Sequence, residues 1–172
     1  WQPVDARTWR FRLRPDVRFH DGSAFTADDA VFSIERALAK NSQRSFQLRG
    51  VTGARRVDAN TVDVSTAAPD AFLPEKLVFI GIMSRAWATR HGVLQPQDLN
   101  AKQETYAVRH ANGTGPYRLV SYEADQRVRL AAHEGWWGKR GDVDAAEFLV
   151  IASDATRMAA LASGQVDLVI DP

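Results

Sequence analysis

The sequence predicts a mixed α/β fold of the α+β kind, in which short strands and hairpins alternate with amphipathic helices. Residues 8–14 alternate apolar and charged side chains, which is the pattern of a half-buried strand. Residues 26–40 repeat apolar side chains at helical spacing. Two later stretches, residues 51–66 and 117–132, each have the strand-turn-strand pattern of a hairpin.

The first strand carries Trp9, Phe11 and Leu13 on one face and three arginines on the other. Pro15 ends it, because proline cannot donate a hydrogen bond to a neighbouring strand. One face of this strand is therefore expected to contribute to a hydrophobic core.

The stretch His20-Asp21-Gly22 joins this strand to the first helix. Glycine takes a positive φ without steric cost, and aspartate bonds its own backbone, so we interpret the stretch as a structural turn and not as a catalytic His-Asp pair. Thr26 is the expected N-cap, and two aspartates in the first turn complement the helix dipole. The helix is predicted over residues 26–40.

The next part of the chain contains a hairpin that turns at residues 58–60. A short helix with Pro74 near its start is predicted over residues 70–77. Residues 78–83 are apolar, and periodicity does not distinguish a strand from a buried loop there. Residues 91–112 are polar and irregular, which predicts a surface excursion and a candidate boundary.

A turn at residues 113–117 opens the second hairpin, and Trp136 and Trp137 are expected to pack at its end. Three segments then have strand, helix and strand character: residues 147–151, 154–163 and 165–170. This order and spacing predict a parallel βαβ unit, so that hairpins and parallel pairing together make a mixed sheet.

Composition excludes several classes of protein. The chain has 172 residues, 45% of them hydrophobic and 25% charged, which is typical of a soluble globular domain with its own core. Its net charge of +1 gives no reason to expect binding to nucleic acid or to anionic membranes. The absence of cysteine excludes disulfides and cysteine-type zinc sites. No export signal is recognisable at the amino end.

No catalytic, metal or cofactor motif is recognisable. The four histidines do not form a pair at helical spacing, and no serine lies in a nucleophile motif. Gly113-x-Gly115 resembles a fragment of a phosphate loop, but Pro116 lacks an N–H and no Gly-Lys-Ser/Thr follows. We therefore expect a chain without enzymatic activity, metal site or cofactor.

Several motifs occur in an order that is more specific than any one of them: TWRFRLRPDVRFHDG (8–22), FTADD (25–29), GTGPY (113–117), WG (137–138), DATR (154–157) and LASGQVDL (161–168). In this order the chain resembles the extracytoplasmic solute-binding proteins of the dipeptide, oligopeptide and nickel ABC importers, family 5. It departs from the family's pattern at two positions. His133-Glu-Gly-Trp136 stands where the family usually has Asn-Pro or Asn-x-x-Tyr, and Ser153 stands where it usually has proline.

The resemblance implies a fragment of lobe 1 of a two-lobed periplasmic-binding-protein fold. Residues 1–108 would form the extra subdomain of lobe 1 that is particular to this family, and residues 109–172 part of its hinge-proximal α/β subdomain. The second lobe and the amino-terminal strands would lie outside this sequence. In relatives, most of the charged residues that clamp a peptide belong to that second lobe.

The resemblance also implies a function. The protein would be a periplasmic or otherwise extracytoplasmic monomer that captures a small solute, with di- or oligopeptides favoured, and delivers it to an ABC permease. A nickel chelate, a sugar and an opine stay open as ligands. The alternative is a solute-sensing regulator built on the same lobe.

In relatives, the loop after the first helix and the apolar stretch after the proline-containing helix approach the ligand. The residues here are Gln43, Arg44, Phe46, Phe79, Ile80, Gly81 and Met83. An aromatic ring, an arginine and a flexible methionine suit a wall that tolerates varied ligands. We expect Phe46, Ile80 and Met83 to be partly exposed. For Phe79 and Ile80, burial statistics favour the alternative that both side chains lie in the core.

Overall fold

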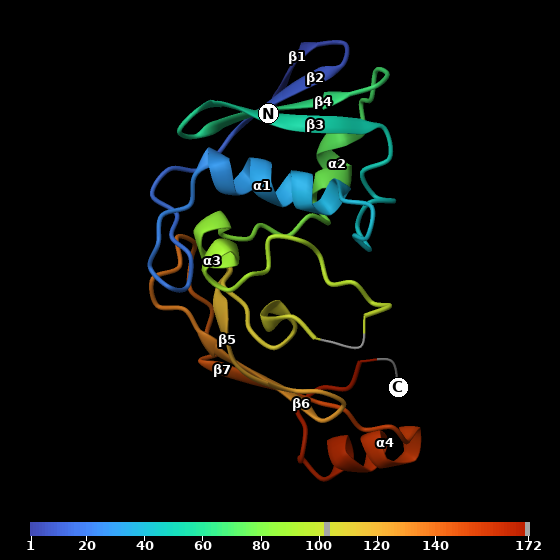
Figure 1. The fold of residues 1–172 in the computed structure, drawn as a ribbon. Coiled ribbons are helices and arrows are strands. Elements are labelled where there is room, and N and C mark those ends of the chain that lie inside the picture. Colours follow the sequence, from blue (N-terminus) through green and yellow to red (C-terminus); the bar gives the residue numbers. More distant parts are fainter. Residues whose placement is uncertain (102–103, 171–172) are drawn as a thin grey trace.

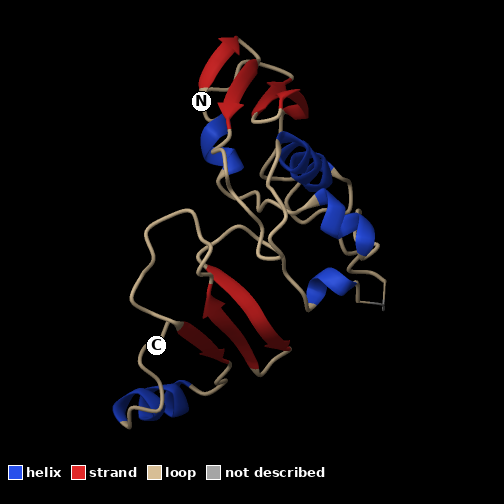
Figure 2. Cartoon of the chain, turned by 90° about the vertical axis from the view of Figure 1, so that its left-hand side faces the viewer, coloured by secondary structure: helices blue, strands red, loops and turns tan. Residues whose placement is uncertain are grey.

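The computed structural model describes residues 1–101 and 104–170. Its strands form a four-stranded sheet of order β1-β2-β4-β3 and a three-stranded sheet of order β5-β6-β7. The four-stranded sheet lies at one end of the molecule with helix α1 below it, and the three-stranded sheet lies at the other end, next to α4 (Figure 1). Loops connect the two sheets (Figure 2). The mixed α/β class predicted from the sequence is confirmed.

The four-stranded sheet is antiparallel throughout. Its strands are β1 (Gln2–Asp5), β2 (Thr8–Arg12), β3 (Val51–Asp58) and β4 (Thr61–Thr66). Strand β2 and the β3–β4 hairpin agree with the prediction, whereas β1 is not predicted because its four residues are too short to show periodicity. As predicted, Trp9, Phe11 and Leu13 pack against the core.

Helix α1 (Ala27–Leu38) lies on the inner face of this sheet. Its start agrees with the expected N-cap, because the backbone N–H and the Oγ of Thr26 both donate to the Asp29 carboxylate, each over 2.9 Å. The same carboxylate accepts the backbone N–H of Arg85 over 2.8 Å. The buried Asp29 carboxylate therefore caps the start of α1 and also fixes the backbone at Arg85.

Two short helices complete this part of the molecule. Helix α2 (Leu73–Leu77) has Pro74 in its first turn, as predicted. Residues 78–84 then run as a loop into α3 (Arg85–Arg90), which is too short to be predicted from periodicity. In the predicted surface excursion, the described residues contain one 3-10 turn, η1 (Tyr106–Val108).

The outer face of the four-stranded sheet holds a buried carboxylate. Asp63 on the central strand β4 is only 2% exposed. Arg10 on β2 pairs with it over 2.7 Å and Arg55 on β3 over 2.6 Å. The hydrogen bond from Arg10, with the positive charges of Arg10 and Arg55, holds the pKa of Asp63 below its ordinary value. These ion pairs tie three strands together on the side away from α1.

The three-stranded sheet contains β5 (Tyr117–Glu123), β6 (Arg127–Ala132) and β7 (Ala145–Leu149), all antiparallel. The predicted hairpin over residues 117–132 is confirmed. Helix α4 (Asp154–Ala162) follows, also as predicted, with Ser153 as its N-cap.

The predicted parallel βαβ unit is wrong. Residues 165–170 pair with no strand in the described part of the chain, and every pairing described there is antiparallel. Leu168 and Ile170 in this segment remain exposed, at 74% and 66%. A strand depends on a neighbouring backbone for its hydrogen bonds, so an apolar alternating pattern without such a neighbour does not form one.

The turn before α1 is structural, as the sequence indicates. Asp21 Oδ1 accepts the Ser23 backbone N–H over 3.0 Å and the Ser23 hydroxyl over 2.6 Å. Gly22 between them has φ +83°, in the left-handed region where side chains are strained. Backbone conformation explains this glycine, because a Cβ would meet no atom within 4 Å.

The substitution Gly22→Val is expected to lower the free energy of unfolding by about 1–2 kcal/mol, because a β-branched residue is strained at positive φ. Gly141→Val is the matched control, since Gly141 also has open space around its Cβ position but no positive φ. Urea unfolding of both variants tests this. Equal stability losses in the two would show that φ at Gly22 is not the cause.

Replacing Asp63 with asparagine is expected to lower the free energy of unfolding by about 2 kcal/mol at neutral pH, because two arginines lose their counter-charge. The group's lowered folded-state pKa contributes stability that is present above its unfolded pKa of about 3.9 and is lost as pH falls through the folded-state value. The difference in the free energy of unfolding between wild type and Asp63→Asn should therefore become smaller at acidic pH.

Asp142→Asn, at an exposed aspartate, is the control and should leave the stability nearly unchanged. Urea titrations at pH 7 and pH 3 measure both effects. An equal difference in stability between wild type and Asp63→Asn at the two pH values would contradict a role for the charge of Asp63.

Candidate functional site

The loop after α1 presents three of the predicted ligand-binding residues to solvent. Gln43, Arg44 and Phe46 are exposed, and the Phe46 ring is 68% accessible. Serine hydrogen bonds shape the loop: the Ser42 hydroxyl accepts the Arg44 N–H over 3.1 Å. Leu48, buried in the core, anchors its end. The expected exposure of Phe46 is confirmed.

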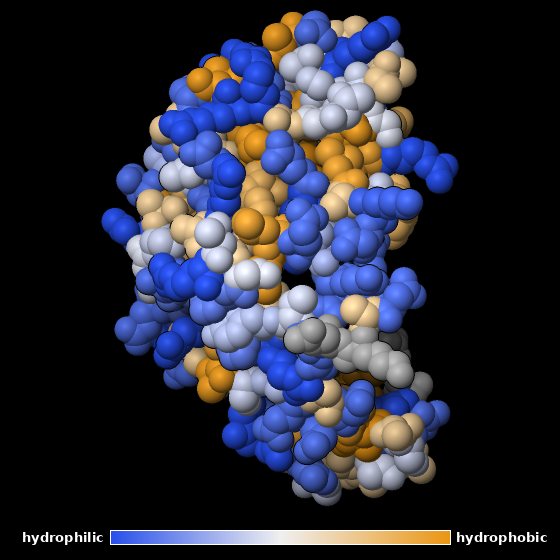
Figure 3. Space-filling view, in the orientation of Figure 1, coloured by the Kyte–Doolittle hydropathy of each residue, from blue (hydrophilic) through white to orange (hydrophobic). Residues whose placement is uncertain are grey.

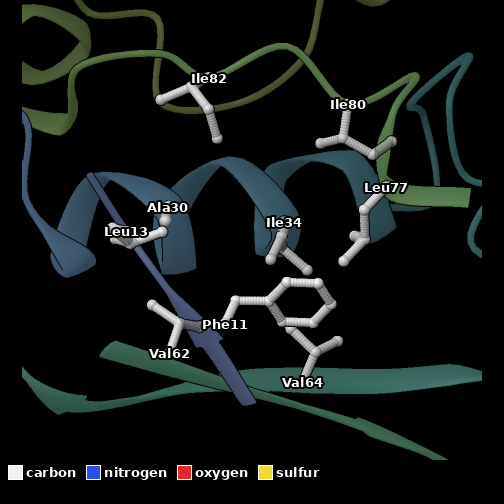
Figure 4. A pocket seen from close by; sticks show the side chains of 9 residues that line it. All are labelled: Phe11, Leu13, Ala30, Ile34, Val62, Val64, Leu77, Ile80 and Ile82. Atoms are coloured by element: carbon white, nitrogen blue, oxygen red, sulfur yellow. The ribbon is translucent and has the colours of Figure 1, made fainter. Parts of the chain in front are cut away.

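The second predicted segment, residues 79–83, alternates between solvent and core. Phe79 is 58% exposed, whereas Ile80 is 9% exposed and belongs to the core cluster. The expected partial exposure of Ile80 is therefore wrong, because its side chain points from the loop on the other side of α1 toward Leu77 and Ile34 in the core (Figure 4). Met83 is half-buried, as expected.

Met83 is held in place through α1. The buried Ser33 hydroxyl accepts the Met83 backbone N–H over 2.9 Å, and its distance to the Met83 carbonyl oxygen is 3.3 Å. Gly81 lies exposed between Ile80 and Met83 and contributes only backbone to the surface. The loop conformation therefore turns Phe79 and Ile80 to opposite sides.

A hydrogen bond links the loop after α1 to helix α2, which precedes the second segment. Lys76 on α2 donates from Nζ to the Arg49 carbonyl over 3.1 Å and pairs with Asp70 over 2.6 Å. The hydrogen bond from Lys76 lowers the pKa of Asp70. Because Leu48 and Leu73 share one core cluster, the loop after α1 and the segment after α2 rest on the same support.

A surface hollow of about 260 Å³ gathers part of the predicted set. Gln43, Arg44 and Met83 line it together with Arg36 and residues of the 96–108 region, whereas Phe46, Phe79, Ile80 and Gly81 do not. The hollow thus combines amide, guanidinium and thioether groups. Such a lining can contact both polar and apolar parts of a ligand.

Sequence reasoning missed Arg36 as part of this hollow. Its half-buried guanidinium donates to the backbone carbonyls of Val93 over 3.3 Å and Gln95 over 3.1 Å. Burial lowers the pKa of Arg36. A cation in the last turn of a helix ordinarily indicates only a dipole contact, so nothing local distinguishes this arginine from a solvated one.

A second cavity, of about 120 Å³, is bordered by α1, the four-stranded sheet and residues 77–82. All nine residues that line it are apolar (Figure 4). Because no polar group is present to orient a solute, this cavity is a gap in the core and no ligand site. Apolar side chains also reach the surface between β3 and α1 (Figure 3).

The middle region of family 5 of the bacterial extracellular solute-binding proteins matches this chain over residues 1–172. The chain belongs to this family. Among curated relatives, the family 5 chain is 29% identical to the dipeptide-binding protein of Escherichia coli K12, over 98% of this chain and 34% of that protein. It is 31% identical to heme-binding protein A of Haemophilus influenzae, over 98% and 33%.

A third relative is a regulator. The HTH-type transcriptional regulator SgrR of Yersinia enterocolitica is 28% identical over 88% of this chain and 24% of that protein. Among solved structures, NikZ of Campylobacter jejuni in complex with Ni(L-His) aligns with a TM-score of 0.81 at 23% identity, covering 96% of this chain and 32% of that one. This likeness confirms the fold predicted from the resemblance.

The family 5 chain spans about a third of the length of the dipeptide-binding and heme-binding relatives and about a quarter of SgrR. None of the helices in its described residues is long and apolar enough to cross a bilayer. The described residues likewise gather no group of three or more side chains suited to hold a metal ion.

Because the chain has no cysteine and its described residues gather no group of three metal-binding side chains, we predict that bare Ni²⁺ and Zn²⁺ bind it no better than scattered surface histidines bind them. Isothermal titration calorimetry with each metal salt measures this. A stoichiometric site with a submicromolar dissociation constant would contradict the prediction, whereas capture of a chelated metal by a two-lobed protein would not.

Proposed function

We propose that this chain is part of the solute-binding component of an ABC importer, which captures a small solute outside the cytoplasmic membrane and delivers it to a permease. The observation that carries the proposal is the family match over residues 1–172. The relatives named as periplasmic proteins support a location outside the cytoplasmic membrane. We expect the protein to act as a monomer, without nucleic acid and without catalysis.

The proposed ligand is a di- or oligopeptide. A relative named for dipeptide binding supports this class, although other relatives are named for heme and nickel. Gln43 and Arg44 in the hollow offer hydrogen-bond donors for a peptide backbone, and Met83 offers an apolar contact for its side chains. Phe46 and Phe79, which are close to these residues in sequence, are exposed and offer further apolar contacts.

In this proposal, residues 1–108 form the family-specific subdomain of lobe 1 and carry the proposed ligand residues, and residues 109–172 form part of its hinge-proximal subdomain. The presence of one sheet in each range supports the division. Gly81 contributes backbone to the proposed surface, and Ile80 supports it from the core.

A solute-sensing regulator is the second candidate, and the similarity to SgrR favours it. The complete gene discriminates between the two. An export signal and a second lobe would support the importer component, whereas a fused helix-turn-helix domain without an export signal would support the regulator.

The 172-residue chain by itself is expected to bind peptides weakly, because one lobe offers only part of the contacts and leaves the ligand in water. Loss of about 4 kcal/mol of contact energy weakens binding roughly a thousandfold. A peptide library titrated against this chain and against a protein that includes the second lobe tests this. Micromolar binding by the short chain would place specificity in it.

In the two-lobed protein, Phe46→Ala is expected to weaken the affinity for a bound peptide about tenfold, by removing an exposed aromatic contact. Phe72→Ala is the matched control, since Phe72 is similarly exposed, at 71%, but is not among the proposed ligand residues. Fluorescence titration with the same peptide measures both. Equal affinities for Phe46→Ala and wild type would remove Phe46 from the site.

A further inference from the structure

Two histidines meet where the turn before α1 lies against the start of the β5–β6 hairpin. The ring centroids of His20 and His133 are 4.9 Å apart, with the planes at 65°. His20 belongs to the turn, and His133 directly follows β6. The contact therefore joins the part of the chain that holds the four-stranded sheet to the part that holds the three-stranded sheet.

The hydrogen bonds of His20 require a neutral ring. Its Nδ1 accepts the Gly113 backbone N–H over 3.3 Å, and its Nε2–H donates to the Gly115 carbonyl over 3.0 Å. A proton added at Nδ1 would face the N–H of Gly113, so the charged ring cannot keep both bonds. Two further bonds cross here: His20 N–H to Gly113 O over 2.8 Å and Asp21 N–H to Asn112 Oδ1 over 3.1 Å.

The surroundings of His133 also favour a neutral ring. Its Nε2 is enclosed and has no hydrogen-bond partner among the described residues. The ring packs over Gly135, where a Cβ would lie 3.2 Å from it. Burial lowers the pKa of His133, and the positive charges of His20, when protonated, and Arg118 lower it further.

The other charged groups near the junction do not offset the effects that lower the pKa of His133. Arg118 on β5 is a cation, and the Asp21 carboxylate on the turn accepts the backbone N–H and the hydroxyl of Ser23. Arg90 on α3 acts on Asp21 through its charge. No salt bridge to either histidine is present among the described residues, and Glu134, the carboxylate next to His133 in sequence, is exposed to solvent.

We propose that the His20–His133 pair is an acid-sensitive latch that holds the two sheet-bearing parts of the chain together when the His133 ring is neutral and loosens when His133 takes up a proton. In the variant His133→Asn the side chain at this position does not titrate, so the latch would lack its response to acid.

The pH window follows from His133. Its folded-state pKa lies below the value of about 6.5 for an unfolded chain. The latch therefore contributes its full stability above about pH 6.5, and this contribution is lost as pH falls from there through the folded-state pKa. Each unit of separation between the two values corresponds to about a tenfold change in the unfolding equilibrium constant.

The experiment compares wild type, His133→Asn and His110→Asn by urea unfolding of the 172-residue chain at steps from pH 8 to pH 5. His110 is the control, because it is exposed and its ring stacks on Tyr106 and not at the junction. Wild type and His110→Asn should lose stability together below pH 6.5, whereas His133→Asn should lose less. Parallel curves for all three would overturn the proposal.

A second measurement does not depend on the folding of a variant. In an NMR titration of wild type, the His133 ring should titrate below pH 6.5, and the amide resonance of Gly113, which donates to His20, should shift in the same range. Titration of His133 at or above its ordinary pKa, or a Gly113 amide that does not respond, would contradict the latch.

Discussion

The four-stranded sheet depends on the Asp63 carboxylate, which binds guanidinium groups from both neighbouring strands on the sheet's outer face. Burying a carboxylate is costly unless it is paired, so β2 and β3 must lie in register with β4 to bring Arg10 and Arg55 opposite it. That register turns Val62 and Val64 toward α1 and builds the core. The loops of the proposed ligand surface rest on this core through Leu48 and Ile80.

A second buried aspartate, Asp29, positions two of the helices. Asp29 caps α1 and accepts the backbone N–H at the start of α3, so the loop of residues 78–84 is held to α1 at the end where α3 begins. This support explains how an irregular segment can present Phe79 outward and Ile80 inward with no strand pairing. The proposed ligand surface is therefore a set of loops positioned by polar contacts behind it.

The candidate site was predictable only in part. The position of Phe46 in a polar loop already indicates exposure, and the structure agrees. Ile80 was placed by resemblance alone, and its burial follows from the contact with Leu77 and Ile34 across the core. Arg36 joins the hollow because the distant carbonyls of Val93 and Gln95 fix its guanidinium. Such contacts link residues more than fifty positions apart, which local periodicity does not encode.

By itself the sequence determined the family, the first helix with its cap and both hairpins, because caps, turns and alternation act between residues a few positions apart. The tertiary structure decided the rest. Residues 165–170 have a strand pattern but lack a paired neighbour, and His20 reaches Gly115 across 95 residues of chain. Pairing, burial and protonation depend on which distant groups the fold brings into contact, and only the folded chain specifies them.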